Sequence, residues 1–323
     1  MSPITHRFVK TNGINMHIAE AGSGPTVILV HGFPDFWYSW RHQLSALAGA
    51  GFHAVAPDVR GFGETDVPIG AENYTAFDIT GDLVGLINAL GDERVFVVGH
   101  DWGAEHAWNL ALLWPDKIRG VVTLSVPYSP RQEKGSSLKI LGSRLGDGWY
   151  MSQFQKPGYA ESEFRRIGLS TFLGHVLLSS STKPWVIPEG KSLGDDMQGP
   201  VELTPWLTAE DLDRYVEAFE KSGLTGPINV YRAIERTWEQ LAPYTKAKIQ
   251  APAFFIAGSR DIVWHVPGTR AYVEGGGLKH FVPNLRGYVV LDSGHFMQQE
   301  KSEEVNQLLI KFLQQELNQQ SRL

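Results

Sequence analysis

The sequence predicts an α/β protein with a mostly parallel, eight-stranded sheet that is covered by helices on both faces and interrupted by a helical insertion. Apolar runs of strand length alternate with helical patterns over the first 125 residues, and two more such runs follow after residue 250. The stretch between them breaks this rhythm. Continuous apolar strands alternating with helices are typical of a parallel sheet buried on both faces.

The chain begins with a predicted β-hairpin. The β-prone runs HRFVKT (6–11) and INMHIAE (14–20) are separated only by Asn12 and Gly13. Asn-Gly between two such runs favours a two-residue hairpin turn.

The remaining core elements follow in alternation. Residues 76–91 place apolar side chains on one helical face and end at Gly91, a typical C-terminal cap. A second helix, 102–114, is stopped by Pro115. We expect a further helical stretch at 36–51, and strands at 26–32, 53–61, 94–99, 120–125, 252–258 and 287–292.

The insertion lies between the sixth and seventh core strands. Its clearest helix covers 208–223, where Thr208 and Asp211 resemble a capping pair and Gly223 ends the pattern. The Pro- and Gly-rich stretch 183–206 is expected to be a long loop. We expect a core domain of residues 1–128 and 246–323 and a helical cap (lid) domain of residues 129–245, because long excursions from a sheet often cover its functional edge.

Composition excludes several classes of function. The net charge of -6 disfavours nucleic acid or an anionic membrane as a partner. The absence of cysteine excludes disulfides, thiolate zinc sites and a cysteine nucleophile. The N-terminus has no apolar segment typical of a signal peptide, and no apolar run is long enough to cross a bilayer. We therefore expect a cytoplasmic protein.

The stretch GHDWG (99–103) is the first chemical signal. It follows a predicted strand and opens a helix, and it matches the G-x-S-x-G turn of many hydrolases with Asp101 in the serine position. The two glycines allow a sharp turn at the carboxyl end of the strand, where parallel sheets bind ligands. Asp is also a favoured helix N-cap, so the motif alone leaves a purely structural role open.

Other strand ends add partners to Asp101. HGFP (31–34) ends the third strand, and its loop can aim the Phe33 N–H at the same point as the Trp102 N–H, which together would form an oxyanion hole. Phe33-Pro34 is a candidate cis peptide. Asp261 and His295 follow the last two strands. Each alone is a common turn or loop residue, but the order nucleophile, acid, histidine predicts a catalytic triad.

An aspartate nucleophile points to attack on an sp³ carbon. The product is an ester on the enzyme's own carboxyl group, which water activated by His295 can hydrolyse, whereas a serine would form an inert ether. Asp261 would orient the imidazole. The leaving group is then a halide or an epoxide oxygen, and the oxygen needs a proton donor such as tyrosine, with an ordinary pKa of about 10.

The sequence resembles the epoxide hydrolases of the α/β-hydrolase fold, close to the soluble plant and bacterial type. The resemblance spans nearly the whole chain and is carried by HGFPDFWYSWRHQ (31–43), PDVRGFGETD (57–66), GHDWGA (99–104), YMSQFQKPGYAE (150–161), NVYRAIER (229–236), SRDIV (259–263) and SGHF (293–296). It implies that Tyr150 and Tyr231, in the lid, donate to the epoxide oxygen. Seen alone, Tyr231 could be a core aromatic residue and Tyr150 a loop residue.

Four further residues are expected at the substrate pocket. Trp37 and Trp149 are candidate apolar lining residues, and His100 precedes the nucleophile. Asp35 stands where relatives often have Glu, at a position that the resemblance links to a water relay.

The expected reaction needs a small hydrophobic epoxide and water, without a cofactor. We expect no nucleotide cofactor, because no glycine-rich phosphate loop follows a strand, and no metal, because no residues stand at the spacing of metal ligands. Two alternatives remain: a haloalkane dehalogenase with the same aspartate, and a non-catalytic relative that binds a hydrophobic ligand. The sequence leaves monomer or homodimer open, as it does a role in detoxification, assimilation or biosynthesis.

Overall fold

Eight strands form one sheet in the computed structural model, which describes residues 3–179, 181–197, 199 and 201–320. The strand order is β1-β2-β4-β3-β5-β6-β7-β8, with antiparallel pairing of β1 with β2 and of β2 with β4, and parallel pairing from β4 onward. The strands are β1 (Thr5–Thr11), β2 (Ile14–Ala21), β3 (Thr26–Val30), β4 (His53–Pro57), β5 (Val95–His100), β6 (Ile118–Leu124), β7 (Ala253–Gly258) and β8 (Leu285–Leu291). The predicted mostly parallel, eight-stranded sheet is confirmed.

The first two strands form the predicted hairpin. Thr11 pairs with Ile14, so that only Asn12 and Gly13 make the turn. Both turn residues have positive φ (44° and 81°), as a two-residue hairpin of this hand requires.

Strand β4 is shorter than the sequence predicts. It ends at Pro57 instead of residue 61, because Asp58 turns the chain. The Asp58 carboxylate accepts hydrogen bonds from the backbone N–H groups of Trp37 (2.8 Å) and Glu64 (3.1 Å), which fixes a loop there.

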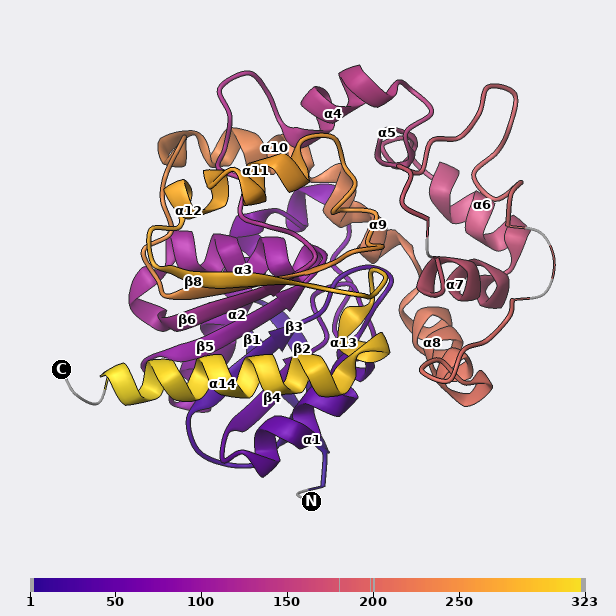
Figure 1. Ribbon diagram of the computed structural model, residues 1–323. Helices are drawn as coiled ribbons and strands as arrows, with labels where there is room; N and C mark the ends of the chain where they lie inside the picture. The colour runs from indigo at the N-terminus through magenta and orange to yellow at the C-terminus, as the bar shows by residue number, and fades with distance from the viewer. Residues whose placement is uncertain (1–2, 180, 198, 200, 321–323) are drawn as a thin grey trace.

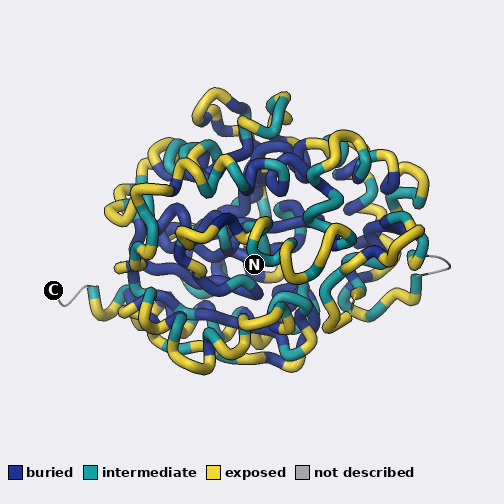
Figure 2. The backbone as a smooth tube through the Cα atoms, turned by 90° about the horizontal axis from the view of Figure 1, so that it is seen from above, coloured by how far each residue is buried: buried dark blue, intermediate teal, exposed yellow. Residues whose placement is uncertain are grey.

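Helices cover both faces of the sheet (Figure 1). One face carries α1 (Arg41–Gly49), α13 (Met297–Glu300) and α14 (Ser302–Gln320). The other carries α2 (Ala76–Leu90), α3 (Trp102–Leu113), α11 (Thr269–Glu274) and α12 (Gly277–Phe281). A 3-10 turn, Trp37–Trp40, precedes α1 within the predicted helical stretch. From above, the buried backbone lies at the centre and the exposed backbone at the rim (Figure 2).

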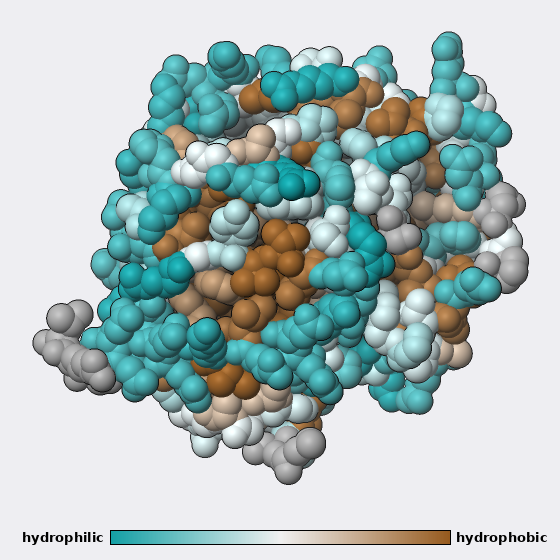
Figure 3. Space-filling view, in the orientation of Figure 1, coloured by the Kyte–Doolittle hydropathy of each residue, from teal (hydrophilic) through white to brown (hydrophobic). Residues whose placement is uncertain are grey.

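Strand β3 explains why both faces must be covered. All five of its residues are buried: Val27 and Leu29 belong to the core beside α1 and α14, whereas Ile28 and Val30 belong to the core beside α2 and α3. Successive side chains of a strand point to opposite faces, so a continuous apolar run requires two apolar layers. The edge strand β8 is less covered; Val290 is 38% exposed, and apolar surface gathers at the middle of this face (Figure 3).

The helical cap enters between β6 and β7, as predicted. Its helices are α4 (Ser137–Leu145), α5 (Tyr150–Phe154), α6 (Tyr159–Ile167), α7 (Leu169–Leu177), α8 (Ala209–Ser222), α9 (Thr225–Arg232) and α10 (Ile234–Gln240). Helix α8 has the predicted capping box of Thr208 with Asp211, and Gly223 is its C-cap. The described residues of the predicted loop 183–206 contain no helix and only isolated bridges.

The cap shares its apolar core with one layer of the sheet domain. Phe154, Phe172 and Tyr231 of the cap lie in the same buried cluster as Phe33 and Trp108. This continuity holds the cap over the carboxyl ends of the parallel strands, where the candidate site lies.

Candidate active site

Asp101 occupies a strained turn between β5 and α3. Its φ of 54° and ψ of -122° lie in a region that non-glycine residues seldom adopt. Gly99 and Gly103 flank it, and a Cβ on either would collide with backbone atoms, on Gly103 and Val30 respectively. The Asp101 side chain makes no capping hydrogen bond to α3, so the N-cap interpretation of this residue has no support.

The Asp101 carboxylate is instead held from two other sides. Oδ1 accepts a hydrogen bond from the Phe33 N–H (2.9 Å), and Oδ2 lies 3.3 Å from Nε2 of His295. Burial raises the pKa of Asp101, but the hydrogen bond and charge of His295, helped by His100 and the Phe33 N–H, lower it below its ordinary value. Asp101 is therefore ionised, and its side chain is 16% exposed; both properties suit the predicted nucleophile.

The loop that carries Phe33 is fixed by His31. The Val59 N–H donates to Nε2 of His31 (3.0 Å), so Nδ1 carries the proton and donates to the Gly32 carbonyl (2.9 Å). Burial lowers the pKa of His31, which keeps the ring neutral in this arrangement. The Phe33-Pro34 peptide is cis, as predicted. Trp102, the other expected oxyanion residue, begins α3 directly after Asp101.

His295 lies between two carboxylates. Its Nδ1 is 2.8 Å from Oδ1 of Asp261, and its Nε2 faces Asp101. Burial lowers the pKa of His295, but the charges of Asp261 and Asp101 and hydrogen bonds to both outweigh burial and raise the pKa well above its ordinary value. Asp261 is fully buried; burial raises its pKa, but the charge and hydrogen bond of His295 lower it below the ordinary value.

Ser125 is a site residue that the sequence did not reveal. It follows β6, has a positive φ of 75°, and brings its Oγ to 3.2 Å from Nδ1 of His295. The one signal in the sequence for Ser125 is its position at the carboxyl end of β6, because this strand lies between β5 and β7 and ligands bind at these strand ends.

Tyr150 and Tyr231 meet above the elbow. Tyr150 begins α5, Tyr231 lies in α9, and their ring centroids are 6.0 Å apart at 73°. The Tyr231 ring packs edge-to-face on Trp102 (5.0 Å) and Phe33 (5.6 Å), which flank Asp101 in the fold. Burial raises the pKa of both phenols, and the charge of Asp101 raises each further, so both stay protonated.

Aromatic side chains support Tyr150. Trp185 stacks on its ring (5.4 Å, 23°), and Trp149, which is 3% exposed, packs edge-to-face against it (5.9 Å). Trp149 was an expected pocket residue, whereas Trp185 lies in the predicted loop, where no periodic pattern marks it. The stack fixes the ring plane of Tyr150.

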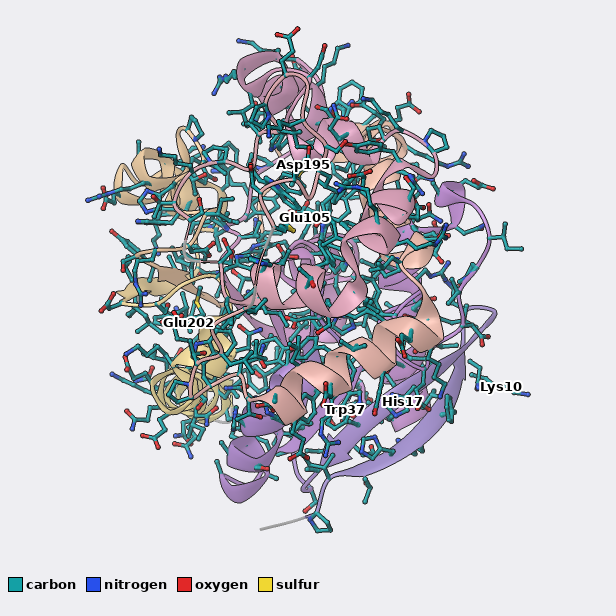
Figure 4. The ribbon with its side chains drawn as sticks, turned by 90° about the vertical axis from the view of Figure 1, so that its right-hand side faces the viewer. Lys10, His17, Trp37, Glu105, Asp195 and Glu202 are labelled. Atoms are coloured by element: carbon teal, nitrogen blue, oxygen red, sulfur yellow. The ribbon has the colours of Figure 1, made fainter. Side chains whose placement is uncertain are left out.

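The other three expected pocket residues, all in the core, lie in different places. Asp35 and His100 are fully buried, and Nδ1 of His100 is 3.4 Å from Asp35 Oδ2. Trp37 lies beside His6 (4.7 Å between rings), near the N-terminal hairpin; Figure 4 labels it beside His17 and away from Glu105. No ring contact or hydrogen bond within the described residues joins Trp37 to Asp101 or His295.

The described part of the chain holds neither a candidate metal site nor a helix suited to span a membrane. Within residues 3–320, apart from the gaps named above, no group of three or more His, Asp or Glu side chains could hold a metal ion. In that same part of the chain, no helix combines the length and apolarity needed to cross a membrane.

The fold and the elbow define the chain as an α/β hydrolase, and a family model described as the alpha/beta hydrolase fold matches residues 25–302. Epoxide hydrolase 1 of Siraitia grosvenorii is 46% identical over 98% of this chain and 100% of its own length. Epoxide hydrolase A of Mycobacterium tuberculosis is 38% identical over 97% and 98%.

Solved structures that resemble this chain are also epoxide hydrolases. An epoxide hydrolase of Vigna radiata superimposes with a TM-score of 0.94 at 40% identity, covering 97% of this chain and 98% of that one. A laboratory evolved variant of potato epoxide hydrolase gives 0.93 at 43% identity, covering 97% and 100%. The chain belongs to the epoxide hydrolases of the α/β-hydrolase fold. The comparisons do not favour the haloalkane dehalogenase alternative.

Proposed function

We propose that this epoxide hydrolase works through a covalent ester on Asp101. The enzyme adds water to an epoxide and yields a vicinal diol. The observation that carries the proposal is the asymmetric setting of the Asp101 carboxylate: Oδ1 is held by the Phe33 N–H, and Oδ2 is 3.3 Å from His295.

In the first half-reaction, Oδ2 of Asp101 attacks one ring carbon of the epoxide. A carbon–oxygen bond to Oδ2 forms as the ring carbon–oxygen bond breaks, and the ring oxygen takes a proton from Tyr150 or Tyr231. The neutral state of both phenols supports this role, because each holds its proton until negative charge develops on the oxygen.

In the second half-reaction, His295 takes a proton from water, and the hydroxide adds to the Asp101 carboxyl carbon. Negative charge then develops on Oδ1, which already accepts the Phe33 N–H; the Trp102 N–H is the proposed second donor. Collapse of this intermediate breaks the bond between the carboxyl carbon and Oδ2 and expels the diol oxygen, which takes the proton from His295. The acid left on Asp101 ionises, and its proton restores the tyrosine. Ester formation prepares the base, because it removes one of the two negative charges that raise the His295 pKa.

His295→Gln tests this scheme. The variant should form the ester but not hydrolyse it, so mass spectrometry after mixing with styrene oxide should find the adduct on the Asp101 peptide. His280→Gln, at an exposed position, is the matched control and should turn over normally. Normal diol formation by His295→Gln would contradict the two-step scheme. Asp101→Ala should form no adduct.

We also propose residues 129–245 as the cap and residues 1–128 with 246–323 as the core, since the strands β1–β6 and β7–β8 flank the helices α4–α10. The proposed substrate is a small hydrophobic epoxide, in keeping with the aromatic side chains around Tyr150. We place the enzyme in the cytoplasm as a monomer or homodimer, without nucleic acid or membrane as a partner, which agrees with its net charge of -6.

A further inference from the structure

A cap tyrosine is hydrogen bonded to a buried carboxylate of the core. The Tyr215 hydroxyl, on α8, donates to Oδ1 of Asp35 at 2.7 Å, and both residues are fully buried. The Tyr215 oxygen accepts in turn from Nε2 of Gln299 (3.0 Å), four residues after His295. One cap side chain therefore meets the two core segments that carry Phe33 and His295.

The second oxygen of Asp35 leads to the catalytic candidates. Oδ2 accepts from Nε2 of Gln298 (3.3 Å) and lies 3.4 Å from Nδ1 of His100. Nε2 of His100 is 2.8 Å from the backbone carbonyl of His295. A carbonyl only accepts, so Nε2 of His100 carries a proton, and Nδ1 of His100 also lies 3.1 Å from Nε2 of Gln298.

This network reaches the base and not the phenols. Tyr215 packs edge-to-face on Phe36 (5.1 Å), and among the described residues none of its ring contacts or hydrogen bonds involves Tyr150 or Tyr231. Its chain of contacts ends at the backbone of His295, through His100, the residue before Asp101. Loss of the Tyr215 hydroxyl would leave the buried Oδ1 of Asp35 without its donor, and Asp35 would shift or turn.

We propose that Tyr215 is a positioning residue for the second half-reaction: through Asp35 and His100 it holds His295 in the geometry for ester hydrolysis. The proposal rests on the proposed function, since it assigns a side chain of the cap to one of the two half-reactions. Water attack on the ester then requires the cap to be packed against the core. Protonation of the epoxide oxygen depends instead on Tyr150 and Tyr231.

Tyr215→Phe is the test, because it keeps the ring on Phe36 and removes only the hydroxyl. Rapid-mixing kinetics with styrene oxide should show hydrolysis of the ester slowed about tenfold or more, and alkylation changed by less than about twofold. The ester then accumulates in the steady state, so KM falls together with kcat. Asp35→Asn should give the same pattern, and the double variant should be no slower than the slower single variant.

Tyr38→Phe is the matched control. The Tyr38 hydroxyl donates to Oδ1 of Asp211 on the same cap helix (2.9 Å), and no hydrogen bond among the described residues joins this hydroxyl directly to Asp35. We expect both rates of Tyr38→Phe to stay within about twofold of the parent. Equal slowing of both half-reactions in Tyr215→Phe, an effect matched by Tyr38→Phe, or no effect would overturn the proposal. Absence of any ester in the parent enzyme would instead contradict the proposed function.

Discussion

Nε2 of His295 lies 3.3 Å from Oδ2 of Asp101, while Nδ1 of the same ring lies 2.8 Å from Oδ1 of Asp261. One imidazole thus faces two carboxylates. In the resting enzyme this favours the imidazolium, although the proposed second half-reaction needs a neutral base. In the proposed mechanism, alkylation of Asp101 removes its negative charge and thereby lowers the pKa of His295.

Replacing Asp101 by Asn should therefore lower the pKa of His295. Asn keeps the shape of the Asp101 side chain and, like an ester, carries no charge. The negative charge of Asp101 is one of the causes that raise the pKa of His295. Imidazole titration by NMR should show the His295 pKa falling in Asp101→Asn while that of exposed His280 is unchanged. An unchanged His295 pKa would mean that Asp101 does not hold the imidazolium.

Phenylalanine at Tyr150 or Tyr231 should slow alkylation. Each substitution removes one hydroxyl above the elbow, and loss of a general acid typically costs about 10²-fold or more. The remaining phenol should sustain part of the rate, so the double variant should be nearly inactive. Single-turnover ester formation measures this, with Tyr288→Phe, at a 40% exposed position, as the control. A double variant that forms ester at the parent rate would remove the phenols from the mechanism.

A methyl group at Gly32 should slow turnover strongly. A Cβ at this position would collide with the Cβ and Oδ1 of Asp101, which pushes the carboxylate away from the Phe33 N–H. We expect Gly32→Ala to lower kcat about 10²-fold, because small displacements of a nucleophile are costly. Gly49→Ala is the control: its Cβ would meet nothing within 4 Å, so activity should stay normal. A fully active Gly32→Ala enzyme would show that Asp101 need not occupy this position.

Glu105 should make stability depend on pH. Its carboxylate accepts one long hydrogen bond, from Asn109 (3.5 Å), and no cation pairs with it among the described residues. Burial raises its pKa to about 7, against 4.5 for an ordinary Glu. Between these two pKa values the folded chain keeps the Glu105 proton, whereas the unfolded chain releases it. The contribution of Glu105 to folding stability therefore falls as pH rises, and the destabilisation is complete above pH 7.

Glu105→Gln should remove this cost. Urea unfolding at pH 8 should find the variant more stable by about 1–3 kcal/mol, with the difference vanishing near pH 4. Glu239→Gln, at an exposed position, should change little at either pH. If the difference in unfolding free energy between Glu105→Gln and the parent stayed constant from pH 4 to pH 8, Glu105 would not titrate with a raised pKa.

The features of the fold and site that the sequence predicts are those encoded by local patterns. The hairpin, the capping box of α8 and the elbow at Asp101 each depend on residues close together in the chain, so their signals survive in the sequence. The order of the triad candidates follows from strand ends, which a parallel topology brings to one edge.

Features that depend on distant contacts were not predictable. Ser125 approaches His295 from 170 residues away, and Trp185 stacks on Tyr150 from a loop without periodicity. The pattern of α8 marks Tyr215 as an apolar-face residue, but its hydroxyl reaches Asp35, 180 residues away, only because of how the cap sits on the core.

In the proposed mechanism, water attacks the enzyme and not the epoxide. A single turnover in oxygen-18 water, with enzyme in excess over styrene oxide, tests it most directly. We predict that the diol from this turnover contains no heavy oxygen and that the peptide containing Asp101 gains it. Heavy oxygen in the diol, with an unlabelled Asp101 peptide, would mean that water attacks the epoxide directly and that no ester forms on Asp101.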